Sequence, residues 1–258
     1  MKMKQGIQLY TVRQLIQTAE DTEKTFAYIK NFGCDVVQIS GIGDIAPEKV
    51  KELVEQFGFD VCVTHKPFDR MVNDLDALIE EHRMIGCDTI GIGSMPGEYR
   101  DDPEKVLAFA RLAGEIGEKM AKKGCHLAYH NHDFEFRPLA DGRTTMQILL
   151  ENTDPSLFGL IPDVAWLQIA GVDPCAFLRD NQARIKVVHM KDYCFEGEKR
   201  RFIEFGKGLM DFPAVYQTCS DCGIPYAVYE QDSDWSDNAL ASCAYSYRKM
   251  LETAAAID

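Results

Sequence analysis

One junction recurs along the chain and limits the folds that it can adopt. An amphipathic helical stretch runs into a glycine, and a short apolar segment begins one to three residues later; this happens around Gly33, Gly58, Gly86, Gly124 and Gly223. Glycine suits the left-handed conformation that ends a helix, and a short apolar run is typical of a buried parallel strand. The repeated helix-to-strand unit therefore predicts a parallel sheet covered by helices.

Three apolar segments without the glycine bring the predicted strands to eight: IQLYT near residue 7, FGLIPDV near 160 and IKVVHM near 187. The strands are predicted to begin near residues 7, 35, 60, 88, 126, 158, 185 and 225. Helices are predicted over 18–31, 47–57, 72–85, 102–122, 142–151, 173–180, 211–221 and 237–254. Eight such units in 258 residues predict an α/β protein, a (β/α)8 TIM barrel of eight parallel strands with outer helices. We expect one domain over residues 1–258, and an open doubly wound sheet is the alternative.

Charge and cysteine usage exclude several classes of protein. The chain carries 41 acidic and 28 basic residues, a formal net charge of -13, which disfavours nucleic acid and anionic membranes as partners. No apolar run is long enough for a signal peptide or a membrane span. The nine cysteines are an odd, scattered set, which favours reduced thiols. We expect a cytoplasmic protein with a small-molecule partner, and the sequence leaves open whether it forms a homo-oligomer.

Polar residues gather where the later strands are predicted to end, which is where the active site of such a barrel lies. Four of the six histidines fall at strand ends. Imidazoles and carboxylates that converge on one cavity are a ligand set for Zn²⁺, Mn²⁺ or Co²⁺. We predict one divalent metal ion, with four ligands: His130, Asp163, His189 and Glu230. The alternative for each residue alone is a hydrogen-bonded polar group in the mouth of a barrel.

Other residues at the predicted mouth are candidates for contact with a substrate. His65 follows the third strand, Tyr10 and Arg13 end the first, and Trp166 follows Asp163 by three residues, where its ring could wall a sugar. The alternatives are a satisfied polar residue for His65, a rim ion pair for Arg13 and helix packing for Trp166. The glycine-rich run 91–97 resembles a phosphate loop only weakly, because no helix is predicted before residue 103.

At these residues the chain resembles the xylose isomerase-like barrel superfamily, which includes sugar phosphate isomerases and epimerases and endonuclease IV-type proteins. The resemblance covers nearly the whole chain and rests on GIQLYTVR, YHNHDFEF, PDVAWLQIAGVDP, VVHMKDY, FGKGLMDF and VYEQD. In relatives such as D-tagatose 3-epimerase, Glu, Asp, His and Glu hold the metal, and the two glutamates move the proton. Asp163, His189 and Glu230 match the last three positions, whereas His130 stands in place of the first glutamate. Glu135 in the same loop could supply the missing carboxylate or could orient a ligand histidine. Trp166 stands where the epimerases carry a substrate-binding histidine.

The resemblance implies a metal-dependent sugar isomerase or epimerase that acts on a keto-sugar or related polyol through an enediolate. Glu230 would be the base, Glu135, His132 or His65 the acid, and Lys191 a contact to the enediolate oxygen. Three alternatives remain: a lyase or dehydratase of the inosose or 3-keto-glycoside type that uses the same enediolate, a non-catalytic sugar-binding barrel, and a phosphodiesterase of the endonuclease IV type, which the net charge disfavours.

Overall fold

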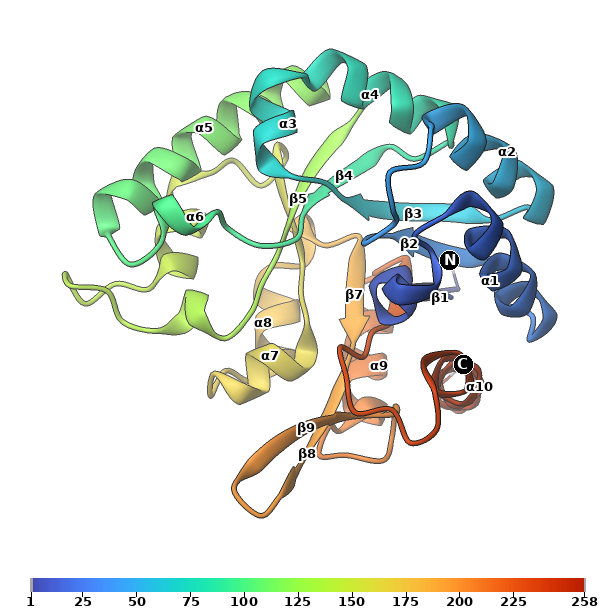
Figure 1. Ribbon diagram of the computed structural model, residues 1–258. Helices are drawn as coiled ribbons and strands as arrows, with labels where there is room; N and C mark the ends of the chain where they lie inside the picture. Colours follow the sequence, from blue (N-terminus) through green and yellow to red (C-terminus); the bar gives the residue numbers. More distant parts are fainter. Residues whose placement is uncertain (1, 258) are drawn as a thin grey trace.

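The computed structural model describes residues 2–257 and contains eight parallel strands that pair in one sheet (Figure 1). The strands are β1 (Lys4–Gln8), β2 (Val36–Ile39), β3 (Asp60–His65), β4 (Thr89–Ile92), β5 (His126–His130), β6 (Phe158–Ile161), β7 (Val187–Met190) and β10 (Tyr226–Tyr229). Hydrogen bonds join them in the order β6-β5-β4-β3-β2-β1-β10-β7. All eight predicted strands are therefore present, and the neighbouring pairs are parallel.

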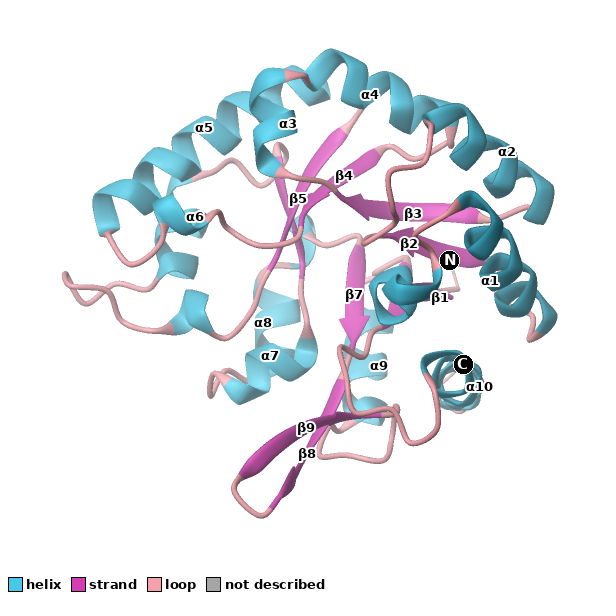
Figure 2. Ribbon diagram, viewed as in Figure 1, coloured by secondary structure: helices cyan, strands magenta, loops and turns pink. Residues whose placement is uncertain are grey.

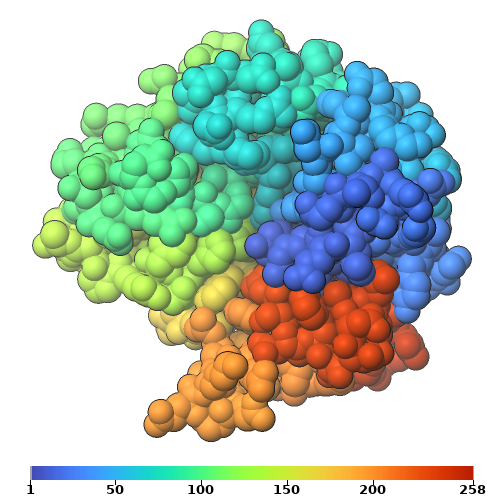
Figure 3. All heavy atoms as spheres, viewed as in Figure 1, coloured from blue at the N-terminus to red at the C-terminus, as the bar shows by residue number. Residues whose placement is uncertain are grey.

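The two strands at the ends of this order, β6 and β7, meet and nearly close a barrel. Single parallel bridges pair Leu160 with Ile185 and Asp163 with His189, and the His189 N–H donates to the Pro162 carbonyl at 2.8 Å. The first and last strands, β1 and β10, pair with each other, and Figure 3 shows the two ends of the chain in contact at the surface. An open doubly wound sheet would keep its edge strands apart, so the (β/α)8 barrel is confirmed.

Helices cover the outside of the barrel (Figure 2). The α-helices are α1 (Ala19–Asn31), α2 (Pro47–Phe57), α3 (Phe68–Asn73), α4 (Leu75–Met84), α5 (Pro103–Ala121), α6 (Thr145–Asn152), α7 (Val164–Ile169), α8 (Pro174–Asp180), α9 (Phe212–Asp221) and α10 (Ala239–Ala255). Short 3-10 helices are η1 (Leu9–Leu15), η2 (Gly97–Tyr99), η3 (Phe134–Phe136) and η4 (Gln182–Arg184). The five junction glycines have φ between 61° and 88°, the left-handed region that a side chain disfavours. No helix within residues 2–257 is both long and apolar enough to cross a bilayer.

The structure differs from the sequence-based prediction in three places. The helix predicted over 72–85 is two helices, α3 and α4, because the backbone leaves the helical region at Asp74. The short helix α7 begins directly after Asp163. An antiparallel hairpin, β8 (Asp192–Glu196) and β9 (Lys199–Ile203), projects from the end of β7 (Figure 1). Half of residues 192–203 are charged, and the longest apolar run among them, residues 193–195, is too short to predict a strand.

The barrel interior has an apolar layer below a polar one. A cluster of buried side chains includes Val36, Ala128, Ile161, Val187 and Val228. Each lies two residues before a polar side chain, in turn Gln38, His130, Asp163, His189 and Glu230. Because side chains alternate along a strand, residues two apart share a face. The apolar layer therefore supports the polar layer at the carboxyl end, where barrel enzymes carry their active sites.

A buried histidine fastens α4 to β3. Nε2 of His82 lies 2.7 Å from the Thr64 hydroxyl and Nδ1 lies 2.6 Å from the Leu78 carbonyl. Burial lowers the pKa of His82 to about 4, from an ordinary value near ~6.5. Between those values the unfolded chain binds a proton that the folded chain does not, so this contribution to stability is lost as the pH falls.

We predict that replacing His82 by Gln flattens the dependence of stability on pH. Between pH ~6.5 and ~4 the wild type should lose up to ~1.4 kcal/mol per pH unit through this one group. The variant should be less stable at pH 7, but the difference in unfolding free energy between the wild type and the variant should become smaller as the pH falls. Urea unfolding across this range measures this difference, and a difference that does not change with pH would contradict the assignment.

Candidate metal centre

Four side chains converge at the carboxyl end of the barrel. His130 ends β5, Asp163 follows β6, His189 lies in β7, and Glu230 follows β10. One ligand atom from each lies within 4.8 Å of the others, and all four residues are buried. The fold thus brings together the four residues that the sequence analysis predicted as metal ligands, and the group could hold a metal ion.

The imidazole of His130 is held so that one nitrogen faces the centre. Its Nδ1 lies 3.1 Å from the Gly93 carbonyl, which can only accept, so Nδ1 carries the proton and Nε2 has a lone pair. Nε2 is buried without a hydrogen-bond partner among residues 2–257. It lies 3.7 Å from both Asp163 Oδ2 and Glu230 Oε2. Burial disfavours the charged ring, but Asp163 and Glu230 outweigh burial and raise the pKa of His130, so a cation bound here would take the place of a proton on Nε2.

The two carboxylate oxygens of Asp163 have different roles: one caps a helix and the other faces the centre. Oδ1 caps α7 by accepting from the N–H groups of Ala165 at 3.0 Å and Trp166 at 3.1 Å. Its own N–H donates to Asn131 Oδ1 at 3.0 Å, which fixes the backbone at the end of β6. Oδ2 is left to face the centre.

His189 is oriented by one residue on each side of its ring. Nε2 lies 2.8 Å from Gln38 Oε1, and Nδ1 lies 2.7 Å from Glu230 Oε2. Because Gln38 Oε1 accepts from Nε2–H, Nδ1 is the nitrogen that faces the centre, which is how outer partners commonly orient a ligand histidine. Burial lowers the pKa of His189, which favours the neutral ring that a metal requires.

A buried lysine carries the only positive charge that directly contacts these carboxylates in the described chain. Lys191 Nζ lies 2.9 Å from Asp163 Oδ2, 3.1 Å from Glu230 Oε2 and 3.0 Å from Asp232 Oδ2. Burial opposes the charge of Lys191, but the three carboxylates outweigh it and hold the pKa of this lysine well above its usual value. Burial likewise disfavours the ionised forms of Asp163 and Glu230, yet Lys191 keeps both pKa values below their usual range. With all three carboxylates ionised, one ammonium leaves two negative charges. Burial raises the pKa of Asp232, and in spite of burial Asp163 and Glu230 raise that of His130, so either protons or a bound cation can balance this excess.

The residues of the centre fit a divalent cation on three counts. Two atoms bound to one tetrahedral ion at ~2.1 Å lie ~3.4 Å apart, close to the 3.7 Å that separates His130 Nε2 from each carboxylate oxygen. The orphaned Nε2 supplies a free lone pair. The uncompensated charge matches a dication. The mixed nitrogen and oxygen donor set suits Zn²⁺, Mn²⁺ or Co²⁺ better than Mg²⁺.

Glu135, a predicted acid, lies outside this group of four. Its carboxylate accepts from the Tyr129 hydroxyl at 2.6 Å and from the His132 N–H at 2.8 Å. Burial raises the pKa of Glu135, and these two hydrogen bonds oppose that effect. In this arrangement Glu135 fixes the backbone of the loop that carries His132.

His132 and Trp166 form a wall beside the centre. The His132 ring lies 4.8 Å from that of His130 and 5.5 Å from that of Trp166, between ring centroids. His132 Nδ1 and Trp166 Nε1 are both buried without a hydrogen-bond partner in the described chain. Burial lowers the pKa of His132 to about 3, so its ring is neutral at pH 7. Two free polar atoms on this wall are available to a polyhydroxylated ligand.

His65 covers another side of the centre. Its ring centroid lies 5.3 Å from that of His130 and 5.7 Å from that of His189, and its Nε2 is buried without a partner among residues 2–257. The glycine-rich run after β4 makes room for it: a Cβ at Gly91 or Gly93 would lie 2.9 Å from the His65 ring. Close packing against His65 therefore explains why glycine stands at positions 91 and 93 in the run that resembles a phosphate loop.

Tyr10 and Arg13 lie at the rim, on η1. Arg13 donates to the carbonyls of Tyr10 at 2.9 Å and Asp232 at 3.1 Å, and its guanidinium stacks 4.3 Å from the centroid of the Tyr10 ring. No carboxylate pairs with Arg13 in the described structure, so the rim ion pair is absent. Arg13 instead ties the first loop of the barrel to the last.

The sequence analysis missed three contributors to the centre. Gln38 and Asp232 each contact a residue of the cluster, and Phe202 on the β9 strand packs edge-on against Trp166 at 5.3 Å. Asp232 follows Glu230 by two residues in VYEQD and could have been found by the period of a strand. Gln38 lies 151 residues from His189 in the chain, so only the closed barrel brings the two together.

Comparison with known proteins gives one family. Residues 26–239 match the family described as xylose isomerase-like TIM barrel. Inosose dehydratase from Geobacillus thermodenitrificans is 30% identical over 208 residues, which cover 68% of each chain. Inosose dehydratase from Bacillus cereus is 36% identical over 155 residues, 57% of this chain. The chain spans about half the length, 47%, of that second relative.

Solved structures share the fold over the full chain. A sugar phosphate isomerase/epimerase from Parabacteroides distasonis superposes with a TM-score of 0.80 at 22% identity, covering 100% of this chain and 96% of that one. L-ribulose 3-epimerase superposes with a TM-score of 0.72 at 17% identity, covering 99% and 96%. At these identities the superpositions show a common barrel.

We predict that His130→Ala removes bound metal while His126→Ala does not. Both residues belong to β5, but His126 is exposed at the opposite end of the barrel from the centre. Losing a ligand should weaken metal affinity by more than the ~10–100-fold typical of losing an outer partner. Metal analysis of both purified variants, with thermal unfolding to show that each is folded, measures the effect. Full metal content in folded His130→Ala would remove His130 from the ligand set.

Proposed function

Because the chain belongs to the xylose isomerase-like TIM barrel family, we propose that it is an enzyme that enolises a small polyhydroxy ketone. The cofactor would be one divalent ion, Mn²⁺, Zn²⁺ or Co²⁺. The observation that carries this proposal is the buried convergence of His130, Asp163, His189 and Glu230 around Lys191. An ion held by these four residues would polarise the carbonyl and stabilise the negative charge that develops on its oxygen.

Glu230 is the base in this proposal. Its carboxylate is ionised at neutral pH, because the Lys191 ammonium outweighs the effect of burial and keeps the pKa of Glu230 well below the usual range. Its close contacts to His189 and Lys191 use Oε2. Oε1 is therefore the atom that takes the proton from the carbon next to the carbonyl. The Lys191 ammonium lies where it can stabilise the enolate oxygen.

Elimination is the outcome that the site favours after this step. Two-base epimerisation needs a second acid–base group at the strand-5 position, but His130 replaces the carboxylate there and its Nδ1 is engaged by Gly93. Elimination of a β-substituent needs one base and one hydrogen-bond donor to the leaving oxygen, which His132 supplies. The proton passes from the carbon to Glu230, the C–O bond to the β-substituent breaks with its electron pair on oxygen, and that oxygen takes the proton back from Glu230 and leaves as water or an alcohol. The two inosose dehydratases among the relatives support a dehydratase or lyase.

Isomerisation or epimerisation is the second candidate, and His65 favours it. Its unpartnered Nε2 lies at the centre on a different side from His132, next to the rings of His130 and His189. Return of the proton from His65 instead of loss of a substituent would give an epimer or an isomer. Both outcomes share the enolate and differ only in its fate.

We predict that Glu230→Gln abolishes proton removal. The amide keeps the shape of the side chain but cannot accept a proton, so the rate should fall ~10²–10⁴-fold. The rate of deuterium incorporation next to the carbonyl of a keto-sugar in deuterated water, followed by proton NMR, measures the step. Glu55→Gln, on the outer helix α2, is the matched control and should exchange at the wild-type rate. Wild-type exchange by Glu230→Gln would assign the base elsewhere.

The reaction products decide between the two candidates. We expect an inosose or a 3-keto-glycoside to lose its β-substituent, seen in the NMR spectrum as a new vinyl proton and a released water or alcohol product. Exchange without loss of a substituent would establish the epimerase or isomerase instead. Metal-loaded protein that binds these ketones without any exchange would leave a sugar-binding barrel and contradict the proposal.

A further inference from the structure

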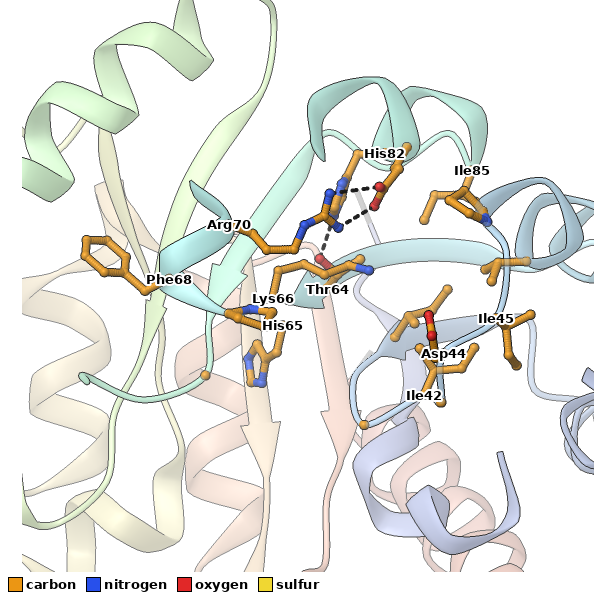
Figure 4. A pocket seen from close by; sticks show the side chains of 18 of the residues that line it. Ile42, Asp44, Ile45, Thr64, His65, Lys66, Phe68, Arg70, His82 and Ile85 are labelled. Atoms are coloured by element: carbon orange, nitrogen blue, oxygen red, sulfur yellow. Dashed lines mark hydrogen bonds and ion pairs between the residues drawn. The ribbon is translucent and has the colours of Figure 1, made fainter. Parts of the chain in front are cut away.

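A second cavity opens beside the metal centre, between the loops that follow β2 and β3 (Figure 4). Its volume is about 590 Å³, within the ~300–1,000 Å³ typical of small-molecule sites. Its apolar wall comes from the loop after β2, from α2, α3 and the end of α4: Ile42, Ile45, Val50, Phe68 and Ile85. We call this space the side cavity. It is large enough for an aromatic ring or a short branched chain.

The side cavity and the metal centre share a wall. His65 lines the cavity, as do Gly93 and Ser94, and the same His65 ring packs against His130 and His189. Gly93 also provides the carbonyl that holds His130. The metal centre and the side cavity therefore lie next to each other, with the His65 side chain between them.

One cation in the side cavity lacks a partner. Arg70 pairs with Glu81 through two bonds of 2.9 Å and with Asp74 at 2.7 Å, and His82 is satisfied by Thr64. Figure 4 draws dashed lines from Arg70 to a carboxylate of the lining and between Thr64 and His82, and none that reaches Lys66. Within residues 2–257 no carboxylate forms an ion pair with Lys66; Asp44, the remaining acid of the lining, is exposed. Burial lowers the pKa of Lys66, and Glu81 partly offsets this.

A half-buried ammonium without a counter-ion, set in an apolar cavity, is suited to an anion that carries an apolar body. In a chain of net charge -13, an anionic ligand also needs such a local cation to be held. We propose that the side cavity binds an apolar, carboxylate-bearing substituent of the substrate, of the aryl carboxylate class, with its anion on Lys66. This inference rests on the proposed function, because the sugar part of the same molecule would lie at the metal centre.

Binding of two probe molecules tests the cavity without any turnover. Benzoate carries the apolar ring and the anion, and benzamide has the same shape without the charge. Wild-type protein should bind benzoate at least ~10-fold more tightly than Lys66→Met does, the range expected for one charge-assisted hydrogen bond. Benzamide should bind both proteins equally, and Lys66→Arg should restore benzoate binding. Titration followed by NMR measures these weak affinities.

The control is Lys122→Met, which removes an exposed lysine at the end of α5 and should leave benzoate affinity unchanged. Val50→Trp fills the cavity and should weaken both probes. Equal benzoate affinity for the wild type and Lys66→Met, or no saturable benzoate binding to the wild type, would overturn the proposal.

Turnover separates this inference from the proposed function. A 3-keto-glucoside with a 4-carboxyphenyl group should react with a higher kcat/KM than its phenyl analogue, and Lys66→Met should remove the difference. Turnover of both at equal kcat/KM by the wild type would overturn the side-cavity inference and leave the proposed function standing. Charge-selective benzoate binding that depends on Lys66, without reaction of any ketone, would support the side cavity and contradict the proposed function.

Discussion

The buried contact between the Lys191 ammonium and three carboxylates is the interaction on which the rest of this site depends. Each carboxylate lies within 3.1 Å of Nζ, and the exposed fraction of the lysine is 1%. Desolvation of so many charges is costly, and removing one partner of a buried pair typically costs ~3–5 kcal/mol. One ammonium cannot balance Asp163, Glu230 and Asp232. Further positive charge therefore stabilises the cluster, and a divalent ion can supply what is otherwise supplied by protons on Asp232 and His130, whose pKa values are raised.

The barrel supplies what this cluster needs to stay in place. The apolar layer, whose residues lie two positions earlier along each strand, excludes water from the space below the charged side chains. Backbone and amide groups then fix the remaining atoms: Gly93 holds His130, Gln38 holds His189, and Asn131 holds the backbone of Asp163. None of these partners is charged. They orient the ring nitrogens and carboxylate oxygens without adding to the charge balance, so the electrostatics of the centre are set by the four proposed ligands, Lys191 and Asp232.

The sequence predicts the strands and the metal-ligand candidates because both depend on local patterns. Glycine-capped junctions mark the strands, and the polar residues at the ends of YHNHDF, PDV, VVHMKD and VYEQD mark the centre. Three features could not be predicted. The apolar residues of the hairpin β8–β9 are interrupted by charged ones, and Gln38 meets His189 only through closure of the barrel. The position of Glu135 could not be predicted either. Its partner Tyr129 has the pattern of an ordinary strand residue in the sequence, but the Tyr129 hydroxyl donates a hydrogen bond to Glu135.

The central claim is that the charge left over around Lys191 is balanced by a metal ion, and thermal unfolding of Lys191→Met tests it most directly. The measured quantity is the difference in Tm between protein with Mn²⁺ and protein in chelator, compared with the same difference in the wild type. We predict that the wild type has a higher Tm with Mn²⁺ than in chelator. This difference in Tm should be larger in Lys191→Met, because the three carboxylates depend more on the ion when the ammonium is absent. A Tm that does not respond to Mn²⁺ or chelator in either protein would show that the cluster does not hold a metal and would contradict the account.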